Sequence, residues 1–225
     1  MKWFCAFALF LIATSSARAQ SSSVGSWYIY IGSQQLSEKL NWHNEVQYRN
    51  FNAAGDLEQL LLRTGIGYNL TPANNNLLLG YAYIYSEAYI PGTDLKRSFS
   101  EHRVFQQFIT RQQFSRFYLQ HRYRFEQRFI ENSDFKMRYR YFLSVNVPLT
   151  NREMVPKTVY LSAYNEIFIN NTSPLYDRNR LYGALGYTIN KYLRAELGVM
   201  SQILENRHRE QVQVVLFNNI PFYED

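Results

Sequence analysis

Apolar and polar residues alternate with a period of two along almost the whole chain after residue 20, a pattern typical of β-strands. Residues 117–129 show it most clearly. One face of this segment is apolar and aromatic, with Phe117, Leu119, Tyr123, Phe125 and Phe129. The other face is polar and mostly charged, with Gln120, Arg122, Arg124, Glu126 and Arg128. Strands with two such unlike faces separate an apolar environment from a polar one.

The alternation predicts eleven strand segments, at residues 27–31, 39–51, 59–70, 77–85, 102–110, 117–129, 136–147, 159–169, 180–189, 193–202 and 211–217. An odd count conflicts with the even strand number of single-chain bacterial membrane barrels, whose two termini lie in the periplasm. Only residues 20–26 precede the first segment, fewer than the ~9 to 11 that a spanning strand needs. Ten strands are therefore preferred to twelve. The predicted fold is all-β, an antiparallel transmembrane β-barrel of 10 to 12 strands.

The connections between these segments alternate in character. Residues 71–74, 112–116, 148–156 and 190–191 are interpreted as turns at one end, and residues 87–98, 131–135, 170–177 and 204–210 as longer loops at the other. Short periplasmic turns and longer outer loops are typical of outer-membrane barrels. No linker, low-complexity tract or repeat divides the chain, which predicts a single domain.

The first twenty residues have the parts of a secretory signal peptide. Lys2 precedes an apolar run over residues 3–13, and Ala17-Arg18-Ala19 forms a small-residue cleavage site before Gln20. The apolar run is shorter than the ~20 residues of a membrane-spanning helix. We therefore expect a cleaved signal peptide at residues 1–19 and an outer-membrane β-barrel at residues 20–225. The only cysteine, Cys5, leaves with the signal, so no disulfide is expected.

Composition narrows the choice of class. The chain is 46% apolar and 17% aromatic, yet its mean hydropathy is −0.37. No second apolar run reaches the ~18 residues expected of a transmembrane helix, which excludes a helical membrane protein. The formal charge of +6 falls to +4 without Lys2 and Arg18. An exported chain does not meet nucleic acid as its routine partner, so this charge does not indicate nucleic-acid binding.

Alternation alone does not distinguish a membrane barrel from a soluble barrel, which turns its apolar face inward. Two features favour the membrane. The apolar face is rich in aromatic residues toward the strand ends, including Tyr81, Phe129, Tyr139 and Tyr141, as in interfacial girdles. The polar face uses arginine far more than lysine, which favours fixed ion pairs over a solvated surface. We expect a location in the bacterial outer membrane with lipids as partners; a soluble periplasmic ligand-binding β-barrel is the alternative.

Several stretches resemble domain-of-unknown-function family 2490. They are Ser26-Trp27-Tyr28, residues 44–49, residues 121–129, residues 164–168 and Arg180-Leu181-Tyr182. The resemblance covers essentially all of the mature chain. It implies an outer-membrane β-barrel of unassigned function, and it supplies no catalytic residues.

Arginines and glutamates on the polar face are the candidate functional residues. They are expected to form a lumenal charged network: Glu45, Arg49, Arg63, Glu101, Arg103, Arg122, Arg124, Glu126, Arg128, Arg138, Arg140, Glu166, Arg180, Arg194 and Glu196. A hairpin near Asn132 would place Glu126 opposite Arg138 and Arg124 opposite Arg140. In the preceding hairpin Arg103 would face Glu126, and Glu101 would face Arg128. A salt-bridged core that fills a narrow barrel is preferred. A narrow pore that passes a small anionic solute is the alternative.

No pattern in the chain indicates catalysis or a cofactor. The histidines are His43, His102, His121 and His208, and none has a metal-ligand spacing; His121 falls on the lipid-facing register. A barrel-borne outer-membrane lipid hydrolase is a further alternative, because His102 lies near Ser98 and Ser100 in the sequence. We expect no enzyme activity, no catalytic residues, no metal and no cofactor; a protein partner is not indicated.

Overall fold

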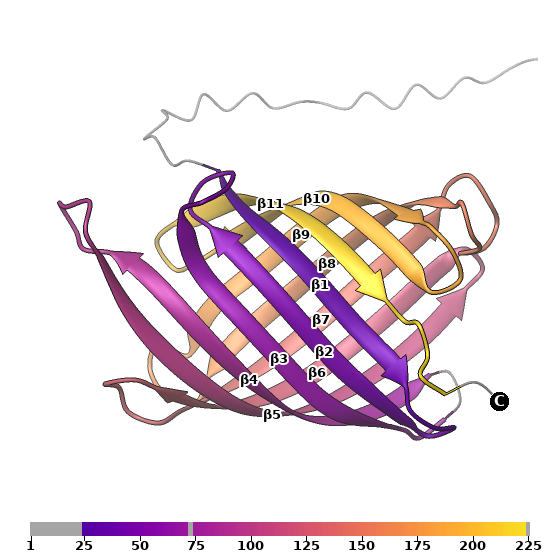
Figure 1. The fold of residues 1–225 in the computed structure, drawn as a ribbon, viewed down its shortest axis with the longest axis horizontal. Coiled ribbons are helices and arrows are strands. Elements are labelled where there is room, and N and C mark those ends of the chain that lie inside the picture. Colours follow the sequence, from indigo (N-terminus) through magenta and orange to yellow (C-terminus); the bar gives the residue numbers. More distant parts are fainter. Residues whose placement is uncertain (1–23, 72–73, 224–225) are drawn as a thin grey trace, which may run out of the picture.

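The computed structural model describes residues 24–71 and 74–223, and all regular secondary structure within them is β-strand. The predicted signal peptide, residues 1–19, lies outside the described residues. The eleven strands are β1 Gly25–Gln35, β2 Leu40–Asn50, β3 Leu57–Asn69, β4 Asn75–Tyr89, β5 Lys96–Phe114, β6 Phe117–Ile130, β7 Lys136–Pro148, β8 Val159–Asn170, β9 Tyr176–Thr188, β10 Leu193–Ile203 and β11 His208–Asn218. They form one closed barrel of tilted strands (Figure 1). No helix in the described parts is long and apolar enough to cross a membrane.

The predicted all-β barrel of 10 to 12 strands is confirmed with eleven strands, and the way it closes corrects two details. Each strand pairs antiparallel with its sequence neighbours, but β1 pairs with β11 in parallel, from Gly25 opposite Gln211 to Gly32 opposite Asn218. Residues 27–31 belong to a full strand, so the preference for ten strands was wrong, and the barrel is mixed rather than fully antiparallel. The physical reason is that the even-number rule applies only when the first and last strands run in opposite directions. A parallel closing pair requires an odd number.

Hairpins join the strands at both ends of the barrel, and the longest connection, residues 149–158, lies at the end where short turns were expected. One end, here called the turn end, holds the connections β1–β2, β3–β4, β5–β6, β7–β8 and β9–β10. The other end, here called the loop end, holds the connections β2–β3, β4–β5, β6–β7, β8–β9 and β10–β11. The long β4–β5 hairpin projects from the loop end (Figure 1). Because β1 and β11 are parallel, β1 starts at the loop end and β11 finishes at the turn end.

Register was predicted correctly in one hairpin and incorrectly in the next. In β6–β7, Glu126 lies opposite Arg138 and Arg124 opposite Arg140, as expected. In β5–β6, Arg103 lies opposite Arg128 instead of Glu126. The difference arises because β5 continues to Phe114 and the turn is only Ser115 and Arg116, with a positive φ of 52° at Ser115. The tighter turn shifts the register by two residues and keeps every side chain on its predicted face.

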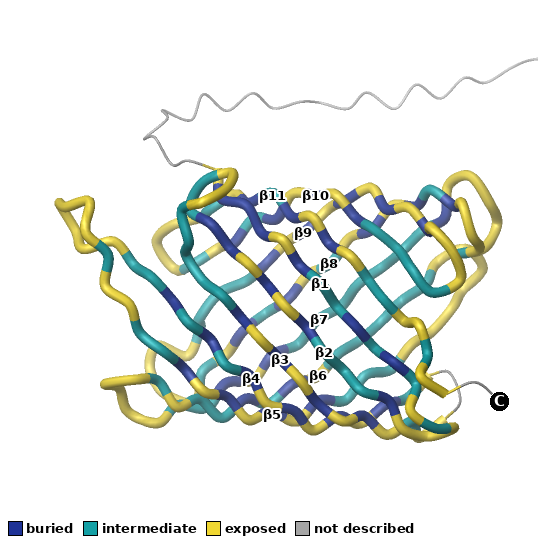
Figure 2. The backbone as a smooth tube through the Cα atoms, viewed as in Figure 1, coloured by how far each residue is buried: buried dark blue, intermediate teal, exposed yellow. Residues whose placement is uncertain are grey.

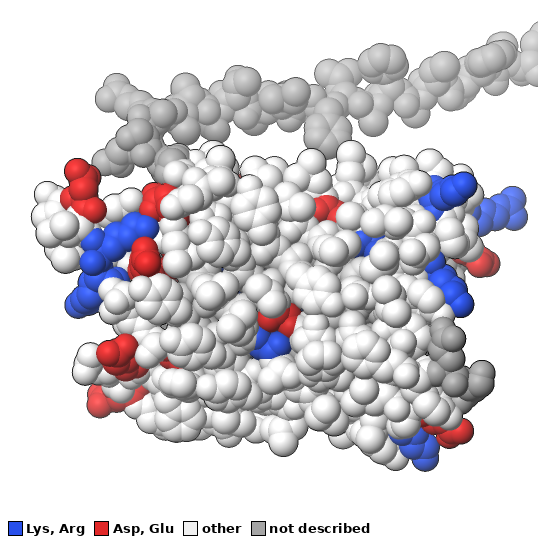
Figure 3. Space-filling view, viewed as in Figure 1, with Lys and Arg blue, Asp and Glu red and all other residues white. Residues whose placement is uncertain are grey.

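Burial alternates along the strands in the sense expected for an apolar outer wall and a polar lumen. In β6, Arg124 and Glu126 are buried, while Tyr123 is 49% exposed. Figure 2 shows the same alternation of buried and exposed positions along the strands in front. On the face drawn in Figure 3, most charged atoms lie near the two ends, and the wall between them is largely uncharged. This arrangement is the reverse of a soluble barrel.

Two glycines make room for large aromatic rings inside the barrel. Gly80 on β4 lies opposite Phe105 on β5, and a Cβ at Gly80 would be 2.2 Å from the Phe105 ring. Gly186 on β9 lies opposite Tyr160 on β8, and a Cβ there would be 2.2 Å from the Tyr160 ring. Glycine opposite an inward aromatic residue lets the ring lie flat on the neighbouring strand. These rings fill space that would otherwise belong to the lumen.

Candidate functional site

A cavity of about 660 Å³ runs inside the barrel, and its lining is strongly basic. Eleven arginines and five glutamates line it. The eleven strands place these side chains there because arginine and glutamate occupy alternate positions whose neighbours face outward. Side chains can fill a barrel of about eight strands, whereas a barrel of about sixteen encloses a wide channel. This barrel lies between the two, and its cavity is small for that size. The lumen is therefore a narrow space inside a charged packing.

Glu126 on β6 is the centre of the ion network and is 1% exposed. Arg138 donates to its Oε2 from Nε at 3.0 Å and from Nη2 at 2.6 Å, and Arg140 donates to its Oε1 at 2.6 Å. Arg124 and Arg103 approach the same carboxylate to 3.7 and 4.0 Å. Four guanidinium groups thus surround one carboxylate. Such a group stabilises the barrel only while all partners remain, because an isolated buried charge is costly.

A second carboxylate continues the network around the barrel wall. Glu166 on β8 accepts hydrogen bonds from Arg140 at 2.6 Å and from Arg122 at 2.7 Å, and Arg180 lies 3.8 Å away. Arg140 therefore bridges Glu126 and Glu166. The connected ion pairs extend over β6, β7, β8 and β9.

Two smaller ion clusters occupy the remaining wall. On β2 and β3, Arg63 donates to Glu45 at 2.5 Å, and His43 Nε2 lies 3.4 Å from the same carboxylate. On β5 and β6, Glu101 accepts from Arg103 and Arg128, each at 2.6 Å from Nε. The second cluster contains the Glu101–Arg128 pair that the sequence predicted. It forms diagonally instead of directly across the strands.

Inward aromatic rings hold the arginines in place, and the sequence analysis missed them. Phe168 lies beneath the guanidinium groups of four arginines at 4.4 to 5.9 Å from its ring centre: Arg138, Arg140, Arg178 and Arg180. Arg63 and Arg124 lie over Phe105 at 5.5 and 4.6 Å. Stacked guanidinium groups are favoured by the negative face of the ring. The sequence did contain a signal for these rings. Residues two apart in a strand lie on the same face, and Phe105 is two residues from Arg103 and Phe168 two residues from Glu166.

Several hydrogen bonds join strands that are not neighbours and so cross part of the lumen. Asn76 on β4 donates to Asn41 on β2 at 2.7 Å, and Arg122 on β6 reaches Glu166 on β8. Tyr160 on β8 donates to Glu196 on β10 at 3.0 Å. These bonds tie side chains of strands two apart to each other along the inner face of the wall.

Most of the predicted lumenal residues are buried where the sequence placed them. Twelve of the fifteen are buried, and three are only half-buried: Arg122, Arg128 and Arg194. Glu196 differs from the other glutamates because its hydrogen bonds come from Tyr160 and Tyr182 and not from arginine. Arg111 and Arg178 also line the cavity and were not among the predicted residues.

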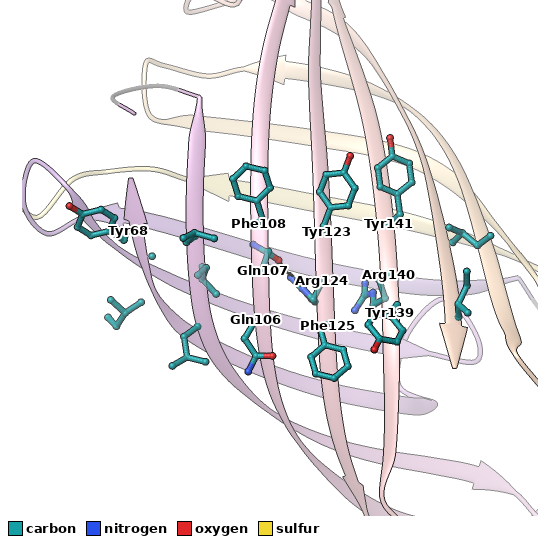
Figure 4. A pocket seen from close by; sticks show the side chains of 17 residues that line it. Tyr68, Gln106, Gln107, Phe108, Tyr123, Arg124, Phe125, Tyr139, Arg140 and Tyr141 are labelled. Atoms are coloured by element: carbon teal, nitrogen blue, oxygen red, sulfur yellow. Dashed lines mark hydrogen bonds between the residues drawn. The ribbon is translucent and has the colours of Figure 1, made fainter. Parts of the chain in front are cut away.

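The outer wall carries a groove of about 770 Å³ across β3 to β8. Figure 4 shows Phe108, Tyr123 and Tyr141 in one row and Phe125 and Tyr139 in a second. The alternate residues, Gln107, Arg124 and Arg140, belong to the opposite face of the same strands. Here outward aromatic residues of neighbouring strands gather as a patch.

The residues of the hydrolase alternative have other partners in the structure. Tyr81 OH lies 2.5 Å from His102 Nδ1, and Ser100 Oγ donates to Glu131 at 3.1 Å. His121 pairs with Tyr141 on the outward face, as its register predicted. Glu131 follows β6 at the loop end, and hydrogen bonds from the backbone and side chain of Ser100 hold the pKa of its carboxyl below the ordinary value.

The fold and the lumen define a class of protein: a closed eleven-stranded β-barrel with an apolar outer wall and a buried network of arginines and glutamates. A family model described as a protein of unknown function, DUF2490, matches residues 24–213. The chain therefore belongs to the DUF2490 family. Comparisons with curated proteins and with solved structures give no match.

Proposed function

We propose that this protein is an integral β-barrel of the bacterial outer membrane whose lumen is closed by ion pairs, so that it acts as a structural or binding protein and not as an open channel. Outer-membrane lipids are its surrounding partners. The observation that carries the proposal is the reversed polarity of the barrel, with charges inside and aromatic and aliphatic side chains outside.

The outer wall supports the membrane part of the proposal. Leu79, Leu185 and Leu197 are 60%, 57% and 60% exposed on three different strands. Such a wall is costly in water, since a monomer rarely exposes apolar patches beyond a few hundred Å². Polar side chains on the same wall bind each other: Asn165 donates to Asn179 Oδ1 at 2.7 Å, and Asn179 donates to Asn165 Oδ1 at 3.3 Å.

The lumen supports the closed state. Glu126 and Arg124 are almost fully buried, and bonds between strands that are not neighbours cross the interior. An open anion-selective pore would need arginines free of carboxylates along a continuous passage. In the network around Glu126, Arg103, Arg138 and Arg140 are each bound to at least one carboxylate.

Fractionation of cells that express the full chain tests the location. We expect the protein in outer membranes, with residues 1–19 removed, and a folded form that migrates differently on a gel before and after boiling. The same test separates the soluble periplasmic alternative, which predicts a soluble protein without a heat shift. Turnover of lipid by the purified protein would instead support the hydrolase alternative.

Planar-bilayer recording tests the closed lumen. We expect negligible conductance for the wild type, and an Arg124→Glu variant that unfolds at a lower denaturant concentration because it places a second carboxylate beside Glu126. Steady anion-selective current through the wild type, reversed in selectivity by Arg124→Glu without loss of stability, would show the lumen to be an open pore.

A further inference from the structure

Two buried arginines beside Trp27 differ from the rest of the network. Arg49 on β2 and Arg180 on β9 lie over the Trp27 ring, with guanidinium carbons 3.8 and 4.9 Å from its centre. They are 8% and 7% exposed, and Trp27 is 3% exposed. Both arginines and the tryptophan line the lumenal cavity. The indole therefore brings two positive charges from distant strands to one place.

Neutral amides make the hydrogen bonds to these two arginines, and only Arg180 has a carboxylate within ion-pair distance in the described parts of the chain. Arg49 donates to Gln47 at 2.9 Å and to Gln59 at 2.6 Å, and it has no carboxylate within 4.0 Å among the described residues. Arg180 donates to Gln202 at 3.0 and 3.1 Å, while its nearest carboxylate oxygen, on Glu166, is 3.8 Å away. An amide oxygen satisfies a hydrogen bond without neutralising the charge. Buried positive charge without a counterion costs free energy.

Further hydrogen-bond donors at the same place have no partner within the described chain. They are Trp27 Nε1 and Gln213 Nε2. Gln213 lies opposite Trp27 in the parallel β1–β11 pair, lines the same cavity and is 2% exposed. Its Oε1 accepts a hydrogen bond from Tyr164 at 3.4 Å, so the amide NH₂ group is the part that can donate to a ligand. Buried donors are normally paired, so two orphans beside two cations indicate a missing acceptor.

We propose that Trp27, Arg49, Arg180 and Gln213 form a binding site for the oxyanion group of a small solute, a phosphate or a carboxylate. The site deepens the proposed function, because it names the class of molecule that the closed lumen binds. An oxyanion supplies both the negative charge and the several acceptor oxygens that these donors lack. The site lies inside the barrel with every member more than 90% buried, so a lipid headgroup in the surrounding bilayer does not reach it.

Titration of the refolded mature chain with inorganic phosphate tests the site. Trp42→Phe leaves Trp27 as the only tryptophan after residue 20, and its fluorescence reports on the cavity. We expect a saturable change that sodium chloride of equal ionic strength does not produce. Arg49→Gln and Arg180→Gln should each weaken binding about tenfold or more, the loss of one charge-assisted hydrogen bond. Acetate as a second titrant distinguishes a carboxylate from a phosphate ligand, and calorimetry gives a readout independent of tryptophan.

Arg111→Gln is the control at an arginine that lines the cavity but is exposed, unlike the buried Arg49 and Arg180. Arg111 lines the cavity from the turn end of β5 and also has no carboxylate within 4.0 Å among the described residues, so its loss should leave the phosphate affinity unchanged. Arg49→Lys, which keeps the charge, should bind more tightly than Arg49→Gln. The heat shift on a gel verifies that each variant is folded.

Three results would overturn the site. They are the absence of a saturable response in folded protein, an equal response to chloride, and undiminished binding by Arg49→Gln. Recovery of the chain as a soluble protein would overturn the membrane proposal alone, and the same titration of that soluble form would still decide the oxyanion site.

Discussion

Replacement of Glu126 by glutamine should destabilise the barrel strongly. The substitution keeps the size of the side chain and removes the charge that Arg138 and Arg140 share through three hydrogen bonds of 2.6 to 3.0 Å. Breaking a buried ion pair on one side typically costs about 3 to 5 kcal/mol. With an m-value of about 2 kcal/mol per molar in urea, this loss lowers the unfolding midpoint by about 2 M. Reversible unfolding in detergent, followed by tryptophan fluorescence, measures it.

Glu196→Gln is the internal control for this experiment. Glu196 is also buried, at 6% exposure, but it accepts its hydrogen bonds from Tyr160 and Tyr182, and no arginine lies within 4.0 Å among the described residues. Neutral partners make the expected loss about 1 kcal/mol. Equal stability of Glu126→Gln and the wild type, or equal losses in both variants, would refute a network that depends on Glu126. Arg140→Gln combined with Glu126→Gln should cost less than the sum of the two single losses, because both remove the same bond.

Three further perturbations test the outer wall, the interior packing and the loop end. Lysine at Tyr139 should cost about 2 to 4 kcal/mol in a bilayer and much less at Ser144 on the other face, measured by unfolding from lipid vesicles; the reverse order would mean that inside and outside are exchanged. Gly80→Ala should cost about 1 to 3 kcal/mol, because its methyl group would overlap the Phe105 ring; an unchanged midpoint would show that the ring moves freely. Glu131 has a lowered pKa, so the stability that its charge contributes is present above the ordinary glutamate pKa and is lost as the pH falls through the folded pKa. The difference in midpoint between the wild type and Glu131→Gln should vanish in acid, and a difference that grows in acid would contradict this assignment.

Faces and short hairpins could be predicted from the sequence because both are local properties. The alternation of side chains along a strand is enough to place Arg124, Glu126 and Arg138 on the inner face. The short connection around Asn132, which has a positive φ of 54°, sets the register of β6 against β7. Two-residue slips preserve parity, which is why the β5–β6 register could be wrong while Arg103 remained inside. The pattern therefore predicts which side of the wall a residue occupies, and it does not predict its partner across the strands.

Closure and lumenal packing could not be predicted in the same way. The pairing of β1 with β11 joins segments nearly 190 residues apart, and no local signal specifies its direction. The rings of Trp27, Phe105 and Phe168 could not be assigned to the lumen from the sequence, because aromatic residues occur on both faces of these strands. Only the distances between strands show that each ring supports arginines. The donors at Trp27 and Gln213 are likewise brought together by closure alone.

The parallel seam between β1 and β11 has a consequence for the assembly of the barrel. In a barrel with an antiparallel seam, the first and last strands can be fused by a short hairpin, so circular permutation there needs few added residues. Here a linker from the end of β11 to the start of β1 must return along the length of an eleven-residue strand, about 36 Å at 3.3 Å per residue. The same geometry means that the seam cannot form by hairpin propagation. The contacts of this seam join the two ends of the chain, so we expect ring closure to be the last and most non-local step of folding.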